Sequence, residues 1–146
     1  MDSLIFHRSD VQALVPAIRP AATRTSDGAI DGAVIDQQAL SDRYEDLVAD
    51  IVTGAYGGTV TDMTLTSKFQ HRATSSDSWE DVTDLNAVEA ATKVLNAQNS
   101  QQTFALRLSH CKRYVKLVST LDINGSDTPS VFVCANYRLG RPTRLG

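Results

Sequence analysis

The chain is poor in the residues that hold small domains together without a large core. Its 146 residues include two cysteines, Cys111 and Cys134, and three histidines. The cysteines form no CxxC pair and have no pair of histidines at metal-ligand spacing, so the sequence predicts no zinc site. We expect both cysteines to be free thiols, as in proteins of a reducing cytosol. A single domain of this length buries enough surface to fold without a disulfide or a metal ion.

Long apolar runs are also missing. No stretch approaches the run of about 18 apolar residues that a membrane-spanning helix needs. The N-terminal sequence MDSLIFHRSD lacks the apolar core of a signal peptide. We therefore expect no membrane partner.

Positive charge is scarce over most of the chain. Residues 1–106 contain seven Lys and Arg against fifteen Asp and Glu, whereas residues 107–146 contain seven against two. The net charge of −3 argues against simple DNA binding, and we expect no direct nucleic-acid partner. The basic C-terminal part is instead a candidate for contact with an acidic protein surface.

Aromatic residues are few, with one Trp, four Tyr and four Phe, so the core must consist mainly of Val, Ile, Leu and Ala. Strand patterning is plain nevertheless. Residues 59–73, 104–108 and 131–139 alternate with period two, which is typical of half-buried strands. Residues 114–121 and 131–139 flank the turn-like sequence NGSDTP, and we predict that they pair as a long hairpin. Its buried face is expected to hold Val115, Leu117, Val131 and Val133.

Other turn residues divide the remaining chain. Asp27-Gly28 and Asp31-Gly32 are candidate hairpin turns. Gly54, Gly57 and Gly58 are expected to end a strand over residues 46–53. Residues 87–97 have the only strong helix-forming composition, which leaves a short helix and an extended insertion both open.

About seven short strands joined by turn-rich loops predict an all-β fold, either a β-sandwich or a jelly-roll-like barrel. Residues 1–20 are assigned to an extended N-terminal arm. Residues 21–146 are assigned to one domain with a flexible, basic tail at about 140–146.

Catalytic signatures are absent from the sequence. His71 continues the apolar face of the 59–73 strand, and the many carboxylates lie in loops. The glycine-rich stretch GAYGG lacks the GK[ST] ending of a phosphate loop. We expect no enzyme, no cofactor and no metal ion. Trp79, in a polar loop, is interpreted as an apolar plug, and a sugar-binding role is the alternative.

Four segments stand out by their order along the chain: TSKFQHRA at 66–73, DSWEDV at 77–82, KRYVKLV at 112–118 and LGRP at 139–142. Together they resemble small structural proteins of tailed bacteriophages that are often encoded beside the major capsid protein. The resemblance covers about residues 60–142, with a weaker echo at 13–36, and it includes no catalytic motif.

The resemblance implies a capsid decoration, or cement, protein. Such a protein is made in the host cytoplasm, resides on the virion surface and bridges neighbouring subunits of the major capsid protein. Similar proteins are often trimers, so a homotrimer is favoured. The alternatives are another β-rich virion component, such as a tail or head–tail connector protein, and a carbohydrate-binding β-sandwich using Trp79 and Tyr56. The residues predicted to bind partners are Leu4, Ile5 and Phe6 of the arm, and Arg138, Arg141 and Arg144 of the basic end.

Overall fold

The computed structural model describes residues 13–19, 23–40, 43–83 and 92–143, and in these it is almost entirely β. The predicted all-β fold is therefore confirmed. The elements are β1 (Ala13–Ile18), β2 (Gly28–Asp31), β3 (Ile35–Asp36), β4 (Arg43–Arg72), β5 (Glu80–Asp81), β6 (Lys93–Leu95), β7 (Ser100–Arg107), a short 3₁₀ helix η1 (Leu108–His110) and β8 (Tyr114–Thr143).

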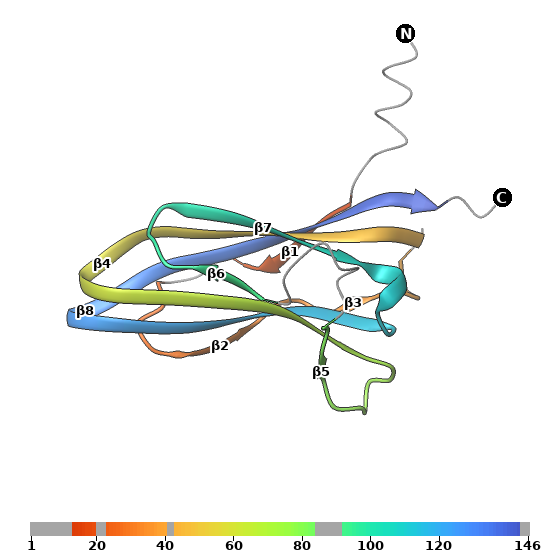
Figure 1. Cartoon of the computed structure of the whole chain (residues 1–146), viewed down its shortest axis with the longest axis horizontal. Coiled ribbons are helices and arrows are strands. Elements are labelled where there is room, and N and C mark those ends of the chain that lie inside the picture. Colours follow the sequence, from red (N-terminus) through yellow and green to blue (C-terminus); the bar gives the residue numbers. More distant parts are fainter. Residues whose placement is uncertain (1–12, 20–22, 41–42, 84–91, 144–146) are drawn as a thin grey trace, which may run out of the picture.

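Two thirty-residue strands, β4 and β8, organise the molecule. They pair antiparallel from Arg43 opposite Thr143 to Arg72 opposite Tyr114. Midway, the paired ribbon folds back on itself (Figure 1). The bend coincides with three register shifts in β4 between residues 53 and 62. It also contains positive φ angles at Gly58, Asp127 and Thr128. Bulges and left-handed residues of this kind increase local twist and turn a strand.

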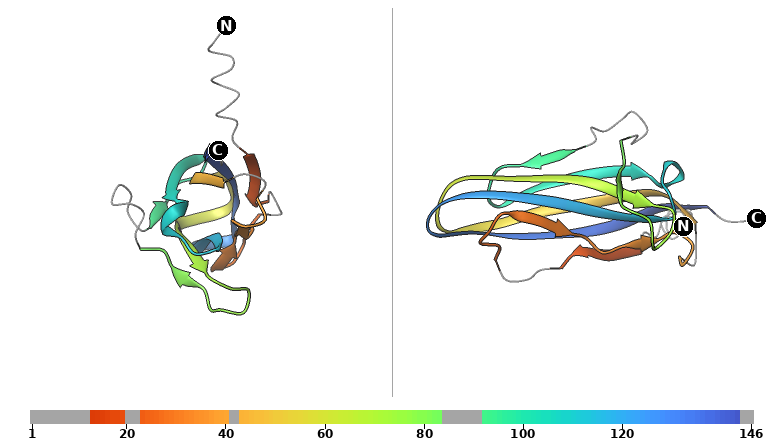
Figure 2. Two further views of the ribbon diagram at one scale, coloured as in Figure 1. Left: turned by 90° about the vertical axis from the view of Figure 1, so that its right-hand side faces the viewer. Right: turned by 90° about the horizontal axis from the view of Figure 1, so that it is seen from below.

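The bend divides the pairing into two half-sheets. The first half-sheet contains, in order, β1, residues 131–143 of β8, residues 43–57 of β4, and β7. The second half-sheet contains β2 with β3, residues 114–126 of β8, residues 59–72 of β4, and β5 with β6. Seen along the long axis, the two half-sheets enclose a common interior (Figure 2). A long antiparallel ribbon folded into two four-stranded halves is a jelly roll, which the sequence analysis had predicted.

The predicted hairpin between residues 114–121 and 131–139 is wrong. Both segments belong to the single strand β8, and each pairs with β4 rather than with the other. The NGSDTP sequence bends β8 from one half-sheet into the other instead of reversing it within a sheet. Turn-forming residues fit either geometry, because alternation identifies a strand and its buried face but not its partner.

Two further turn assignments are corrected by the same pairing. Gly54, Gly57 and Gly58 bend β4 rather than end it, because the strand continues to Arg72. The two Asp-Gly pairs are not hairpin turns, because Gly28–Asp31 is itself strand β2, paired with β8.

The core lies between the half-sheets and follows the predicted alternation. Phe69 and Phe104 come from opposite half-sheets, and their rings stack with centroids 4.6 Å apart. Tyr137 also joins the half-sheets: its hydroxyl accepts a hydrogen bond from Leu117 N at 2.7 Å and donates one to Ala33 O at 2.9 Å. The predicted inward residues of β8 are all buried, namely Val115, Leu117, Val131 and Val133.

The proposed arm and helix fall partly outside the described residues. Residues 13–18 of the segment assigned to the arm form edge strand β1, paired with β8, while residues 1–12 are not described. Of the two alternatives for residues 87–97, the extended one holds where the segment is described, because residues 93–95 form strand β6. The rest of that segment, residues 84–91, is not described. In the part of the chain that the structure describes, no helix has the length and apolar character to cross a membrane.

Candidate interaction surface

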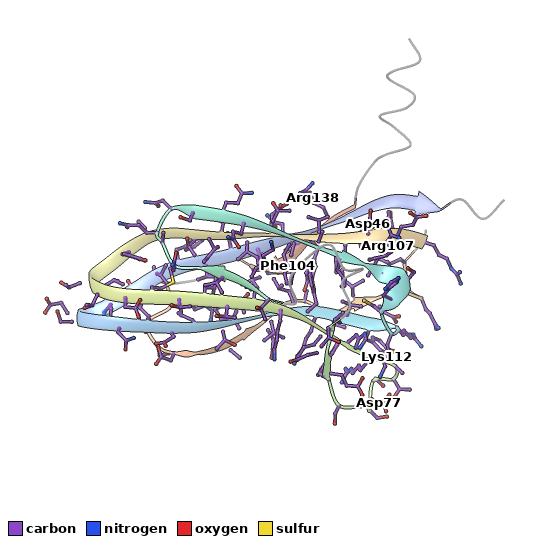
Figure 3. The ribbon with its side chains drawn as sticks, viewed as in Figure 1. Asp46, Asp77, Phe104, Arg107, Lys112 and Arg138 are labelled. Atoms are coloured by element: carbon purple, nitrogen blue, oxygen red, sulfur yellow. The ribbon has the colours of Figure 1, made fainter. Side chains whose placement is uncertain are left out.

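One end of the sandwich holds a dense group of polar side-chain contacts. We call it the terminal end, because β1 begins there, β8 both begins and ends there, and the β4–β5 loop projects from it (Figure 1). The opposite end is the bend of β4 and β8. Asp77 and Lys112 lie at the terminal end, whereas Phe104 points into the interior (Figure 3).

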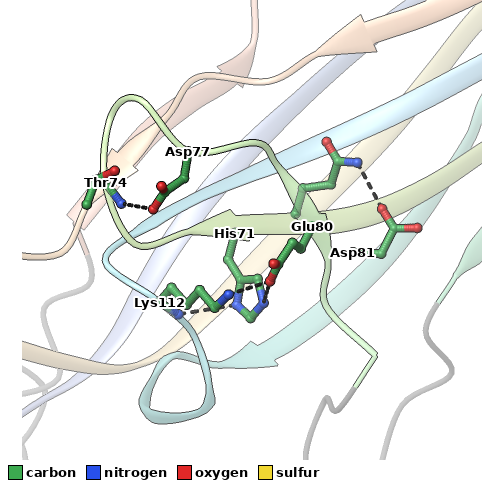
Figure 4. A network of polar contacts seen from close by, with 7 residues as sticks. His71, Thr74, Asp77, Glu80, Asp81 and Lys112 are labelled. Atoms are coloured by element: carbon green, nitrogen blue, oxygen red, sulfur yellow. Dashed lines mark hydrogen bonds and ion pairs between the residues drawn. The ribbon is translucent and has the colours of Figure 1, made fainter.

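A polar network fixes the β4–β5 loop to the start of β8 (Figure 4). Lys112 Nζ contacts the Glu80 carboxylate, and Lys112 N donates to His71 Nδ1 at 3.2 Å. Asp81 accepts hydrogen bonds from Lys68 Nζ at 2.9 Å and from Gln70 Nε2 at 2.8 Å. Residues from β4, β5 and the entrance to β8 are therefore held in one arrangement.

The ionisation of this network is set by its own contacts. Partial burial, with the nearby charge of Lys112, lowers the pKa of His71, although Glu80 acts in the opposite direction. The hydrogen bond from Lys112 keeps the pKa of Glu80 low, and those from Gln70 and Lys68 do the same for Asp81. His71 is therefore neutral at pH 7, and its Nδ1 accepts a hydrogen bond that an imidazolium could not accept.

His71 should make the free energy of unfolding depend on pH, at pH values higher than those at which carboxylates titrate. Because its pKa is lower in the folded than in the unfolded chain, the unfolded state binds protons first as the pH falls. The free energy of unfolding should be constant above about pH 6.5 and should decrease below it. Urea denaturation at a series of pH values measures this slope.

His71→Asn is the informative variant, because its amide oxygen can accept from Lys112 N without titrating. We expect it to flatten the slope just below about pH 6.5. His110→Asn, which removes an exposed histidine, is the comparison variant. A slope unchanged in His71→Asn would assign the pH dependence to other groups.

Trp79 covers two cationic side chains on the outer face of the second half-sheet. The guanidinium of Arg72 lies 4.3 Å from the centroid of the Trp79 ring, and Lys116 Nζ lies 4.5 Å from it. Lys116 is only 9% exposed as a result. Each such cation–π contact contributes about 0.5–2 kcal/mol. Trp79 thus holds the β4–β5 loop against the outer face of β4 and β8, while Val82 is buried in the core.

The basic residues near the C-terminus mostly pair within the chain. Arg113 forms a two-fold contact with Asp36, with both distances 2.8 Å, and Lys116 Nζ lies 3.1 Å from Asp31. These contacts join the basic part of the sequence to its acidic part. The uneven charge of the sequence made its basic part a candidate partner surface. These ion pairs neutralise several of its basic side chains within the fold.

The predicted partner-binding residues are not brought together by the described structure. Arg138 is half-buried in a two-fold ion pair with Asp50, one of whose distances is 3.0 Å. Arg141 lies in β8, and its side chain is not described. Leu4, Ile5, Phe6 and Arg144 lie outside the described residues. Their role in binding stays a prediction.

Groups suited to catalysis do not converge in the described part of the chain. No group of three or more His, Cys, Asp or Glu there could hold a metal ion. Cys111 and Cys134 are free thiols, and burial raises the pKa of Cys134, which disfavours the reactive thiolate. The contacts of His71 are with Lys112 and Glu80, so its hydrogen bonds position a loop rather than activate a nucleophile.

Comparison with known proteins gives no family assignment. No family model matches the chain, and no curated protein matches it. Among solved structures, a chain of Desmodium yellow mottle tymovirus is similar with 11% identity and a TM-score of 0.41, covering 94% of this chain and 86% of that one. A chain of turnip yellow mosaic virus is similar with 9% identity and a TM-score of 0.37, covering 94% and 84%. Both are viral structures, but TM-scores below 0.5 at these identities carry no argument about function.

Proposed function

We propose that this chain is a non-enzymatic virion protein of the decoration type, which binds a phage capsid shell and bridges neighbouring major capsid subunits. The observation that carries the proposal is the convergence of the phage-like segments at the terminal end. Residues 66–73 lie beside residues 112–118, with Gln70 opposite Lys116 and Arg72 opposite Tyr114. Residues 77–82 fold back onto the same strand, with Glu80 opposite His71.

The last phage-like segment, residues 139–142, ends at the terminal end in the other half-sheet, where Gly140 lies opposite Asp46. Segments far apart in the sequence therefore share one end of the molecule, beside the points from which residues 1–12 and 144–146 continue. A shared end is what a common contact surface requires. We assign shell binding to this end, with Arg141 and Arg144 as the residues that contact the shell, and we assign Leu4, Ile5 and Phe6 to docking on a neighbouring subunit.

The physical basis of such a role is binding linkage. A protein that binds the assembled lattice but not free subunits stabilises the lattice by mass action. Many copies joined through modest contacts add avidity without any single strong interface. A rigid sandwich with its polar loops fixed by ion pairs can bridge two subunits without much loss of conformational entropy.

Charge reversal at Arg141 should weaken shell binding without affecting the fold. We expect Arg141→Glu to reduce affinity for expanded capsid-like particles roughly tenfold, because a contact with acidic surface becomes repulsive. Co-sedimentation of purified protein with the particles measures the change. Arg24→Glu is the matched control, because Arg24 lies toward the bend, bridged to Val131. Absence of binding by the unmodified protein would contradict the proposal.

The other candidate functions have less support from the described contacts. A sugar-binding Trp79 would need a free ring face, but the ring already contacts Arg72 and Lys116. A head–tail connector role would be favoured if the isolated protein formed rings of six or twelve copies, which sedimentation would detect.

A further inference from the structure

One of the sheet edges differs from the others. In the second half-sheet the edges consist of strands of two to four residues: β2, β3, β5 and β6. In the first half-sheet, edge strand β1 contains Pro16 and a register shift beside it. Short strands, proline and bulges are the usual protection of an edge against further pairing. β7 has none of them: its eight residues pair in unbroken register with β4, and the first seven are uncharged.

The register shows which backbone groups of β7 face outward. Val131 exchanges both of its backbone hydrogen bonds with Arg24, so its polar groups point away from β4. The direction of the backbone N–H and C=O groups alternates from one residue to the next along a strand. In this half-sheet the even-numbered residues of β8 therefore form hydrogen bonds with β4. The odd-numbered residues of β4 form theirs with β7. The odd-numbered residues of β7 then direct their N–H and C=O groups away from β4. These residues are Gln101, Thr103, Ala105 and Arg107, and no described strand pairs with them on that side.

A second observation lies at the same edge. The side-chain oxygen of Gln102 is buried and has no hydrogen-bond partner among the described residues. Buried polar atoms in folded proteins are nearly always paired, so an orphan acceptor indicates a missing donor. An added strand along β7 would bring donors to this position.

We propose that residues 1–12 of a second copy of this chain add as a strand to the outer edge of β7. The inference rests on the proposed role of Leu4, Ile5 and Phe6 as docking residues. The further step is the surface on which these residues dock, which is the edge of β7, and the partner, which is a second copy of the chain. Strand addition supplies affinity through main-chain hydrogen bonds and specificity through alternate side chains. Leu4 and Phe6 share one side of an extended segment, so both can face the same surface of the partner.

The geometry favours a neighbouring copy over the chain's own segment. Ala13, from which the segment continues, lies in one row with Leu139, Leu47 and Leu106. It is therefore at the β1 edge, about 14 Å from β7 of the same copy across the half-sheet. With copies side by side, the β1 edge of one faces the β7 edge of the next. Twelve residues span up to about 40 Å, which reaches that edge without crossing a sheet face. Such head-to-tail contacts close into rings, including the favoured trimer.

Residue-resolved hydrogen exchange of the full-length protein tests the inference. The amides of Gln101, Thr103 and Ala105 should exchange at least about tenfold more slowly at concentrations where sedimentation shows an oligomer than in the dilute monomer. The amides of Gln102, Phe104 and Leu106 bond to β4 and should be protected at both concentrations. Leu4→Asp combined with Phe6→Asp should abolish the concentration-dependent protection and the oligomer together.

A matched pair of variants at Thr103 tests the edge itself. Thr103→Pro removes an outward N–H, which an edge strand tolerates. Thr103→Val keeps that N–H, and both variants lose the hydrogen bond from the Thr103 hydroxyl to Asp50. Only the proline variant should remain monomeric.

Three results would overturn the inference: protection independent of concentration, protection that persists in the Leu4 and Phe6 variant, or oligomers without protection of the outward amides. Because no shell is present, these results are independent of the shell-binding assay. A monomeric Thr103→Pro that still binds capsid particles would leave the proposed function intact.

Discussion

Val133→Asp is expected to leave the chain unfolded at room temperature. Val133 is 2% exposed and lies in the interior, in the half of β8 that belongs to the first half-sheet. A carboxyl group placed there has no cationic partner, and its burial costs about 4 kcal/mol or more, either as the charge or through the pKa shift that neutralises it. That cost is comparable to the whole stability of a domain this size, about 5–15 kcal/mol. Circular dichroism and urea denaturation measure the loss.

Asn136→Asp provides the matched control on the same strand. Asn136 is exposed on the outer face, opposite Asp50, so the same carboxyl group there should cost no more than about 1 kcal/mol, from repulsion between the two carboxylates. If Val133→Asp kept a cooperative transition at the unmodified midpoint, the assignment of the inward face of β8 would be wrong.

Tyr137→Phe should cost about 2–3 kcal/mol, although it removes a single oxygen atom. The hydroxyl of Tyr137 satisfies the N–H of Leu117 and the carbonyl of Ala33 on the facing half-sheet. Without it, two backbone groups remain buried and unpaired. Burial raises the pKa of Tyr137, so the phenol stays protonated and keeps donating at neutral and mildly alkaline pH.

Tyr56→Phe is the comparison for that experiment. Tyr56 packs against the same core, but its hydroxyl has no hydrogen-bond partner among the described residues. We expect its removal to change the free energy of unfolding by less than about 1 kcal/mol. Equal effects of the two substitutions in urea denaturation would show that the link between half-sheets through Tyr137 contributes little.

Gly32 explains why Tyr137 can make this link. A Cβ atom at Gly32 would lie 2.6 Å from the Tyr137 hydroxyl and 2.8 Å from the carbonyl oxygen of Leu117. The absence of a side chain therefore lets the loop between β2 and β3 approach the phenol closely. By sequence alone Gly32 is a turn residue, because a glycine that accommodates a distant side chain has no local signal.

The sequence by itself determined which residues form strands and which side of each strand is buried. Alternation placed Phe104, Leu106 and Leu108 on one face, and Met63, Leu65 and Phe69 on another, and all six are buried. This information is local, because successive side chains of a strand point to opposite faces whatever the strand pairs with. The all-β, sandwich-like fold follows from the same local pattern.

Only the tertiary structure decided which strands are neighbours and where the charges go. Whether NGSDTP closes a hairpin or bends one long strand depends on β4, about 70 residues earlier, because that strand supplies the hydrogen-bond partners on both sides of the bend. The acidic and basic residues are separated along the sequence, and the basic last part is by sequence a candidate for contact with an acidic partner. In the fold, Asp36 meets Arg113 and Asp50 meets Arg138. Pairing between distant segments is a property of the register, which no local pattern carries.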